Sequence, residues 1–302
     1  MPRAAETRQS ISYLTRRFKE VGIEPNARHG QNFLVDLNLL RLLADSAELT
    51  RDDVVLEIGT GTGSLTALLA ARAAAVVTVE VDRRMYSLAS EELIDYPNVT
   101  MLLQDALANK NTLHPAVLAA VRRELDAGPN RRFKLVANLP YNIATPIVTN
   151  LLAEEHPPES MTVTVQKEVA DRMLAAPGTK DYGALSIWVQ SQCRVEILRV
   201  LPPQVFWPKP KVHSAFVKLA FDPALRARIA DLAFFHQFVR AMFLHRRKLL
   251  RGVLVSAYKE QLGKSGVDVL LARVGLPETA RAEELDVAAM LKLSEAVRAA
   301  IG

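Results

Sequence analysis

The chain has 302 residues, of which 49% are hydrophobic and 24% charged, and its formal net charge is +5. At roughly 150 residues per domain this length predicts two domains, and a chain of this size builds a core without crosslinks. A single cysteine, Cys193, excludes an intrachain disulfide and a cysteine-based metal site. The charged N-terminus lacks the apolar stretch of a secretory signal, and Arg72 and Glu80 interrupt the most apolar segment, 65–81. We therefore expect a globular cytoplasmic protein, not a membrane protein, a disulfide scaffold or a fibrous chain.

The charge is distributed unevenly along the chain. Residues 1–30 hold six Lys or Arg residues against three acids, residues 197–221 hold four against none, and residues 222–302 hold thirteen against nine. The intervening block, 31–196, therefore carries −6. A mildly acidic body between basic segments is expected of a protein that binds a polyanion. An ordinary solvated surface explains the same counts equally well, so charge alone does not decide.

Predicted strands and helices alternate as far as residue 221. A basic amphipathic helix over 7–21 comes first, and a helix over 36–47 follows with Asp36 as its N-cap. Strand patterns lie at 54–58, 75–81, 99–105, 133–140, 161–167, late in 184–200 and at 214–221, and helical patterns lie at 64–73, 83–93, 143–154, 168–175 and early in 184–200. This alternation predicts a doubly wound, Rossmann-like α/β sheet.

The chain changes character after residue 221, where only helical patterns remain. We predict a basic N-terminal extension over 1–29, an α/β domain over 30–221 and a small C-terminal all-helical domain over 222–302. Residues 106–132 combine polar and helical pieces, to which the sequence assigns no role.

A glycine-rich turn follows the first buried strand and contains Gly59, Gly61 and Gly63. Such turns let a ligand approach the backbone, and nicotinamide, flavin and S-adenosylmethionine (SAM) proteins all use them. Glu80 ends the next strand, where a carboxylate can accept both hydroxyls of a ribose. Asp105 ends the third strand, where SAM enzymes place an acid near the adenine amino group. The alternative interpretation is that Glu80 and Asp105 are only helix N-caps.

The fourth strand ends in Asn138-Leu139-Pro140-Tyr141. The Asn138 side-chain oxygen and the Leu139 carbonyl offer two acceptors that can orient an exocyclic amine, and Pro140 fixes the turn that presents them. Tyr141 offers a face for a flipped base. This arrangement predicts methyl transfer to an amine by positioning. The alternative is a plain turn between a strand and a helix.

These elements together resemble the KsgA-type ribosomal RNA adenine dimethyltransferases of the small subunit. The resemblance rests on residues in family order from 30 to 251, namely Gly30 to Leu34, Leu56 to Thr66, Glu80, Asp105, Asn138 to Ile143, Gln166 to Val169, Tyr182 to Ser186, Phe206 to Ser214 and His245 to Lys248. It implies SAM as the cofactor and the 16S rRNA of the 30S subunit as partner. The six histidines show no metal-ligand spacing, so we expect no metal site. The implied product is N6,N6-dimethyladenine at two adjacent adenines in a hairpin loop near the 3′ end, with a role in 30S biogenesis, and we expect a monomer.

The resemblance also implies a role for individual residues. Asn32, Leu34 and Gly59 would contact SAM, and Phe206 would stack on the target base opposite Tyr141. The full predicted sets are Asn32, Leu34, Gly59, Gly61, Gly63, Glu80, Asp105 and Asn138 for the cofactor, Asn138, Leu139, Pro140, Tyr141 and Phe206 for catalysis, and Lys209, Lys211, Arg246, Arg247, Lys248 and Arg251 for RNA. For any single basic residue, a solvated surface remains the simpler interpretation.

Two residues depart from the family pattern. Thr60 stands where the family usually has Pro, and we expect SAM binding to survive because the turn depends more on its glycines. Trp207 occupies a position that is often smaller, where it either adds stacking or packs.

Three alternative functions remain open. An Erm-type enzyme of large-subunit rRNA shares this fold and chemistry, but Leu139 and the run from Phe206 to Ser214 favour the small-subunit type. A non-catalytic RNA-binding factor would not need the turn from Asn138 to Tyr141 or Glu80. A nicotinamide-dependent oxidoreductase would need hydride-transfer residues that we do not find.

Overall fold

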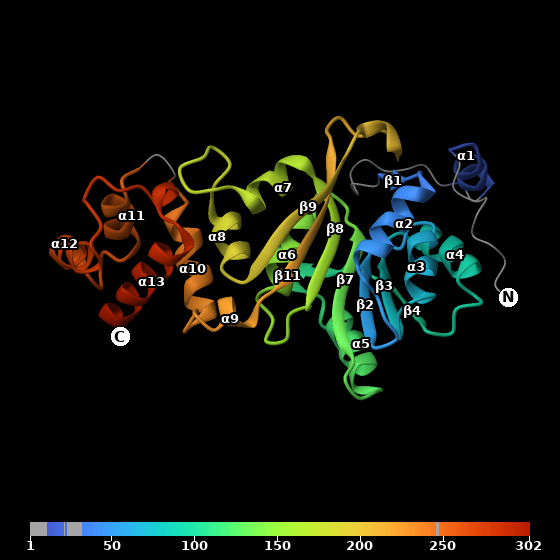
Figure 1. Ribbon diagram of the computed structural model, residues 1–302, viewed down its shortest axis with the longest axis horizontal. Coiled ribbons are helices and arrows are strands. Elements are labelled where there is room, and N and C mark those ends of the chain that lie inside the picture. Colours follow the sequence, from blue (N-terminus) through green and yellow to red (C-terminus); the bar gives the residue numbers. More distant parts are fainter. Residues whose placement is uncertain (1–10, 21, 23–31, 246–247) are drawn as a thin grey trace. The chain divides into compact units, whose positions relative to one another are not determined.

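The structure is a computed structural model that describes residues 11–20, 22, 32–245 and 248–302 (Figure 1). Most of the predicted extension over 1–29 lies outside these ranges, as do Gly30, Arg246 and Arg247. Within the described ranges, no helix is both long enough and apolar enough to cross a membrane.

The largest sheet has seven strands in the order β4-β3-β2-β7-β8-β11-β9. Its strands are β2 (Asp53–Ile58), β3 (Ala75–Glu80), β4 (Val99–Leu103), β7 (Arg132–Asn138), β8 (Ser160–Gln166), β9 (Cys193–Leu201) and β11 (Ser214–Phe221). Strands β4, β3, β2, β7 and β8 run parallel, and β11 runs antiparallel to β8. The predicted α/β sheet is confirmed. Every residue of β2 and β3 is buried, because helices cover both faces of the sheet.

The connecting helices are α2 (Leu37–Ser46), α3 (Ser64–Ala70), α4 (Arg83–Glu92), α5 (Pro115–Asp126), α6 (Ala144–Leu151) and α7 (Lys167–Leu174). Five of these six helices begin within one residue of where the sequence predicts them; α5, inside the unassigned segment 106–132, was not placed by the sequence. Asp36 is the N-cap of α2, because its carboxylate accepts hydrogen bonds from the backbone N–H groups of Asn38 and Leu39. Asp82 caps α4 in the same way. Leu43 of α2 and Leu69 of α3 share a buried core with Val55 of the sheet.

Two short ribbons were not predicted from the sequence. Strand β1 (Phe33–Leu34) pairs antiparallel with β10 (Phe206–Trp207), which follows a 3-10 turn over Pro203–Val205. Within 106–132, β5 (Leu107–Asn109) pairs with β6 (Thr112–Leu113) ahead of α5. Strands of two or three residues are too short to show a periodic pattern. An N-terminal helix, α1 (Ile11–Glu20), lies within the predicted helix over 7–21.

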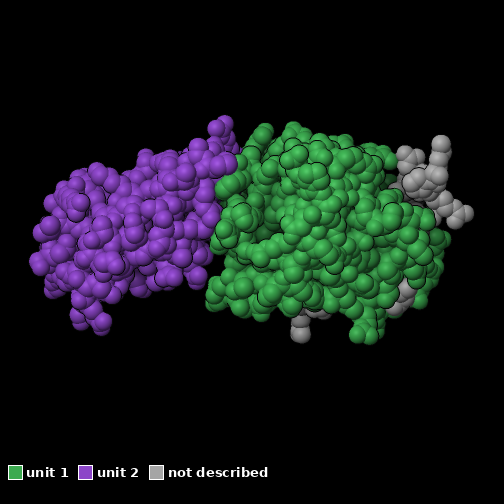
Figure 2. All heavy atoms as spheres, turned by 90° about the horizontal axis from the view of Figure 1, so that it is seen from below, with its two compact units in different colours: residues 1–170, 196–221 green, residues 171–195, 222–302 purple. Residues whose placement is uncertain are grey.

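The chain divides into two compact units, coloured separately in Figure 2. Unit 1 comprises residues 1–170 and 196–221, and unit 2 comprises residues 171–195 and 222–302. Unit 2 contains α8 (Ala184–Gln190), α9 (Pro223–Arg226), α10 (Leu232–Met242), α11 (Leu250–Ala257), α12 (Gly263–Val274), a 3-10 turn (Ala282–Glu284) and α13 (Val287–Ile301).

Unit 2 includes residues 171–195, which the predicted boundary near residue 221 assigns to the α/β domain. The ring of Trp188 in α8 lies 4.3 Å from that of His236 in α10, between ring centroids. The Tyr182 hydroxyl donates a hydrogen bond to the Leu285 carbonyl at 2.8 Å. Segment 171–195 therefore packs with the C-terminal helices. Periodicity identifies the apolar face of a helix but not the core that this face joins.

A buried cluster of charges holds the start of β2 to β7. Asp53 is fully buried, and its carboxylate lies 3.0 Å from Arg132 Nε and 3.2 Å from Lys134 Nζ. Lys134 Nζ also donates to the carbonyls of Ala47 and Glu48. The Lys134 ammonium is therefore desolvated, and Asp53 is its buried counter-ion.

Asp53→Ala leaves the Lys134 ammonium buried without a carboxylate, so we expect the free energy of unfolding to fall by about 3–5 kcal/mol. Urea titration of both proteins measures this difference. The double variant Asp53→Leu/Lys134→Met removes both charges and should recover most of the loss. A loss of less than about 1 kcal/mol in Asp53→Ala would show that the cluster is not a significant source of stability.

Candidate active site

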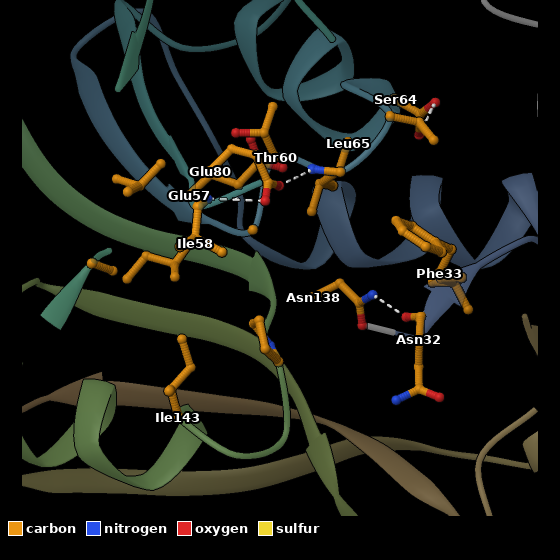
Figure 3. A pocket seen from close by; sticks show the side chains of 18 of the residues that line it. Asn32, Phe33, Glu57, Ile58, Thr60, Ser64, Leu65, Glu80, Asn138 and Ile143 are labelled. Carbon is orange, nitrogen blue, oxygen red and sulfur yellow. Dashed lines mark hydrogen bonds between the residues drawn. The ribbon is translucent and has the colours of Figure 1, made fainter. Parts of the chain in front are cut away.

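The carboxyl ends of β2, β3, β4 and β7 meet at one edge of the sheet and enclose a cavity of about 240 Å³ (Figure 3). Parallel strands necessarily end at the same edge, which is where open α/β sheets bind ligands. Most of the predicted cofactor residues line this cavity, namely Asn32, Leu34, Gly59, Gly61, Glu80, Asp105 and Asn138.

The glycine turn at the end of β2 lines the cavity through Gly59 and Gly61. Gly59, Gly61 and Gly63 have φ angles of +85°, +57° and +78°, a region that residues with a Cβ rarely adopt. A Cβ on Gly61 would lie 3.3 Å from the Phe33 ring, so a side chain there would also push against this ring. Gly63, predicted to bind the cofactor, does not line the cavity. It is the N-cap residue of α3, and a Cβ there would meet Leu93.

Glu80, at the end of β3, fastens the glycine turn to the second strand. Its Oε2 accepts a hydrogen bond from the Gly61 N–H at 2.9 Å, and its Oε1 accepts from the N–H groups of Val81 and Asp82, both at 3.0 Å. Burial raises the pKa of the Glu80 carboxyl, and the three backbone donors oppose that effect. This hydrogen bond to the turn gives the Glu80 carboxylate a role other than that of a helix N-cap. The N-cap of α4 is instead Asp82.

Glu57 is a cavity residue that the sequence interpretation missed. It is 1% exposed, and its Oε2 accepts hydrogen bonds from the hydroxyls of Thr66 at 2.6 Å and Thr78 at 2.7 Å. The Thr60 hydroxyl lies 2.7 Å from that of Thr78, whose proton is already donated to Glu57, so Thr60 is the donor in that pair. The residue that departs from the family pattern thus joins the hydrogen-bond network around Glu57.

Burial in this network raises the pKa of the Glu57 carboxyl to about 8, although the threonine donors lower it and the nearby charge of Glu80 raises it further. A signal for Glu57 was present in the sequence. It is the only acid inside the apolar run 54–58, immediately before the turn. Burying an acid in an apolar run destabilises the fold, so an acid found there indicates a functional site.

The end of β4 supplies the third acidic position. Asp105 lines the cavity and is exposed, and its Oδ1 accepts a hydrogen bond from the Leu107 N–H at 2.9 Å. Residues 106–132 brace this corner, because His114 Nδ1 lies 3.3 Å from the amide Nε2 of Gln104, which also lines the cavity. The segment without a predicted role therefore supports the wall that contains Asp105.

Asn138 brings the fourth strand to the cavity and is tied to the N-terminal segment. Its Nδ2 donates a hydrogen bond to the Asn32 carbonyl at 3.0 Å (Figure 3). Pro140 also lines the cavity, and its carbonyl accepts from the Ile143 N–H at 3.1 Å, which closes the turn before α6. The predicted catalytic turn and the predicted cofactor segment are thus in direct contact.

The other three predicted catalytic residues, Leu139, Tyr141 and Phe206, are not among the residues that line the cavity. The Leu139 side chain is 2% exposed. The Tyr141 hydroxyl lies 2.5 Å from the Ser214 hydroxyl, and burial raises the pKa of Tyr141. Phe206 is 2% exposed and packs in the core beneath α2 and α3, so its ring is not presented to the cavity in this structure. An apolar ring next to Leu34 is more stable in that core than in water.

The predicted RNA contacts fall into distinct settings. Lys209 and Lys211 are exposed in the loop before β11, whose first residue, Ser214, is bonded to Tyr141. Lys248 is exposed in unit 2. Arg251 is paired with the Asp268 carboxylate at 2.5 and 2.8 Å, which raises the pKa of its guanidinium, so this side chain has a structural partner. Arg246 and Arg247 lie outside the described residues.

Within the part of the chain that the structure describes, no three or more His, Cys, Asp and Glu side chains form a group able to hold a metal ion. The acids around the cavity instead bond to hydroxyls and backbone N–H groups.

A family model described as ribosomal RNA adenine dimethylase matches residues 23–298. The chain belongs to this family. This match includes the glycine turn, Asn138 and all of unit 2 except its last four residues, 299–302.

Curated relatives support the assignment to this dimethylase family. The chain is 41% identical over 270 residues to ribosomal RNA small subunit methyltransferase A of Alkaliphilus metalliredigens, a match that covers 89% of this chain and 91% of the relative. It is 41% identical over 276 residues to the protein of the same name from Geobacillus kaustophilus, with 90% and 91% covered.

Two solved structures are similar to this dimethylase along most of its length. A dimethyladenosine transferase from Plasmodium falciparum has a TM-score of 0.71 and 25% identity, and the match covers 85% of this chain and 94% of that structure. The 23S rRNA methyltransferase ErmE has a TM-score of 0.57 and 26% identity, with 88% and 100% covered.

Glu57→Gln tests the buried carboxyl of the dimethylase. A carboxyl whose pKa is about 8 in the folded chain and near 4.5 in the unfolded chain binds its proton more tightly when folded. Its stabilising contribution is therefore complete below pH 4.5 and is lost as the pH rises toward 8. Urea titrations from pH 5 to 8.5 should show the wild-type protein losing stability relative to Glu57→Gln. Parallel pH profiles of the two proteins would contradict the assignment.

Proposed function

We propose that the chain is a SAM-dependent enzyme that converts adenine to N6,N6-dimethyladenine in the rRNA of the small ribosomal subunit. The observation that carries the proposal is the contact between Asn138, at the end of β7, and the cavity formed by the ends of β2, β3 and β4. The match to the adenine dimethylase family supports the reaction, and the relatives named small subunit methyltransferase A support the substrate.

The residues present fit SAM. The ionisable residues lining the cavity are all acids, Glu57, Glu80 and Asp105, which suits a ligand with a positive sulfur and an ammonium group. The backbone at Gly59 and Gly61 leaves room for close approach. We infer that Glu80 binds the ribose and Asp105 the adenine of the cofactor. When bound, SAM supplies a methyl group activated by its positively charged sulfur.

Asn138 is the residue that orients the nucleophile. Because its amide nitrogen donates to the Asn32 carbonyl, its oxygen is the atom left to accept an N–H of the target amine. The Leu139 carbonyl accepts the second N–H, and the two acceptors hold the nitrogen with its lone pair toward the methyl donor. This orientation lowers the barrier without a general base, since the amine becomes acidic once it is alkylated.

Tyr141 and the adjacent loop are proposed to hold the target base. The Tyr141 hydroxyl is fixed by Ser214, which leaves the ring face for stacking on an unstacked adenine. Stacking by Phe206 stays a prediction, and it requires the ring to leave the core in which it now packs. The resemblance supports two adjacent adenines in a hairpin loop near the 3′ end of 16S rRNA as the target.

Binding of the rRNA is proposed to use both units. Lys209 and Lys211 extend from the loop that ends at Ser214, and Lys248 with its neighbours Arg246 and Arg247 gives unit 2 a basic segment. Contacts of this kind bind phosphate and weaken as salt rises. The proposed partner is the 30S subunit during its biogenesis in the cytoplasm, to which the enzyme binds as a monomer.

The Erm-type function is the second candidate, since ErmE shares this fold. Leu139 and the run from Phe206 to Ser214 favour the small-subunit type, and so do the names of relatives at about 40% identity. A purely RNA-binding factor is disfavoured by the glycine turn, Glu80 and Asn138, which all line one cavity.

Asn138→Ala removes the acceptor that orients the amine. We expect the rate of methyl transfer at saturating SAM and RNA to fall by about 100-fold or more, as when a preorganised hydrogen-bond partner is removed from other enzymes. RNA affinity should not change, because the basic residues are untouched. Methyl incorporation from labelled SAM measures the rate, and filter binding measures RNA affinity.

Asn111→Ala is the matched control, since Asn111 lies in the exposed turn between β5 and β6. It should methylate at the wild-type rate. Full methylation by Asn138→Ala would show that Asn138 is not catalytic.

A further inference from the structure

Helix α1 lies ahead of the span matched by the family model, which begins at residue 23. Its two described core side chains, Leu14 and Phe18, are each 1% exposed. They pack with Met85 and Leu88 of α4 in a buried cluster. Three partly buried residues, Phe33, Val35 and Trp207, pack against this cluster. A helix of ten residues is marginal alone in water, so its described conformation depends on this docking.

Phe18 contacts both strands of the β1–β10 ribbon. Its ring centroid lies 5.3 Å from that of Phe33, at an edge-on angle of 70°, and 5.4 Å from that of Trp207. Phe33 and Trp207 are partners in the ribbon's register. Phe18 therefore covers one pair of residues that belong to opposite strands.

Polar contacts fasten α1 to α4. Arg17 forms ion pairs with Glu91 of α4 at 3.1 Å and with Glu20 of its own helix at 3.2 Å. Beyond the helix, the Arg84 guanidinium of α4 donates a hydrogen bond to the Gly22 carbonyl. These contacts supplement the apolar docking in the C-terminal half of α1 and just beyond it.

One strand of the ribbon that Phe18 covers forms part of the cavity wall. Phe33 and Leu34 of β1 line the cavity together with Asn32, whereas no described side chain of α1 does. The Phe33 ring lies against Gly61 of the glycine turn, and the Asn32 carbonyl accepts the hydrogen bond from Asn138. Two-residue strands are marginal by themselves, so this wall needs support from outside the sheet.

We propose that α1 is a strap that holds the β1–β10 ribbon against the glycine turn, and that Phe18 is the positioning residue through which it tightens cofactor binding. The inference rests on the proposed function, because it takes the cavity to be the SAM site. Phe18 touches neither the cavity nor the reacting atoms. It acts through Phe33, whose ring forms part of the wall.

The test compares Phe18→Ala with the wild-type full-length protein by calorimetric titration with S-adenosylhomocysteine. We expect the dissociation constant to rise about tenfold, the size expected for losing two aromatic pairs. Phe18→Leu, which keeps an apolar side chain, should lie between the two. Lys19→Ala is the matched control on the exposed face of α1 and should bind as the wild-type protein does.

Steady-state kinetics separate positioning from a general loss of structure. We expect Phe18→Ala to raise KM for SAM about tenfold while KM for RNA and kcat at saturating SAM stay unchanged, because catalytic residues keep their places once the ligand is bound. Unchanged affinity for S-adenosylhomocysteine in Phe18→Ala would overturn the strap, and so would equal losses in kcat and in RNA affinity. Failure of the wild-type protein to bind S-adenosylhomocysteine or SAM would instead overturn the proposed function itself.

Discussion

The parallel alignment of β2, β3, β4 and β7 is the constraint on which the site depends. It places the residues that end each strand or come just after it at one edge, so the glycine turn, Glu80, Asp105 and Asn138 meet although they span 80 positions of the chain. The hydrogen bond from Gly61 to Glu80 then joins the first two strand ends. The bond from Asn138 to Asn32 joins the fourth to the N-terminal segment. Local contacts fix the details of an arrangement that the topology creates.

Burial of acids at this edge is the main electrostatic feature of the site. Glu57 and Glu80 are 1% and 5% exposed, and each would be strongly destabilising without donors. Threonine hydroxyls donate hydrogen bonds to Glu57, and backbone N–H groups donate hydrogen bonds to Glu80. These donors only partly offset desolvation, since both pKa values remain raised. A cationic ligand would favour the ionised carboxylates, which is a physical reason for retaining two acids beside one glycine turn.

The sequence predicts the parts of the site that follow from strand ends. Buried strands are recognisable as apolar runs, and the residues at or just after their ends, such as Gly59, Glu80 and Asn138, must share an edge in a parallel sheet. Gly63 follows the same turn but faces Leu93, because one more residue carries the chain into α3. The environments of Phe206 and Arg251 could not be predicted from the sequence pattern. An aromatic ring packs in the core and a basic side chain pairs with Asp268, and neither neighbour is close in sequence. For the same reason the β1–β10 ribbon and the place of α8 in unit 2 became clear only from the structure.

The most direct test of the account is methyl incorporation from labelled SAM into unmethylated 30S subunits, with 50S subunits in parallel and mass spectrometry of the digested nucleosides. The account predicts N6,N6-dimethyladenine from the small subunit alone. Product in large-subunit RNA would contradict it in favour of the Erm-type function. No product from either subunit by a protein that binds SAM would show that this fold holds RNA without modifying it.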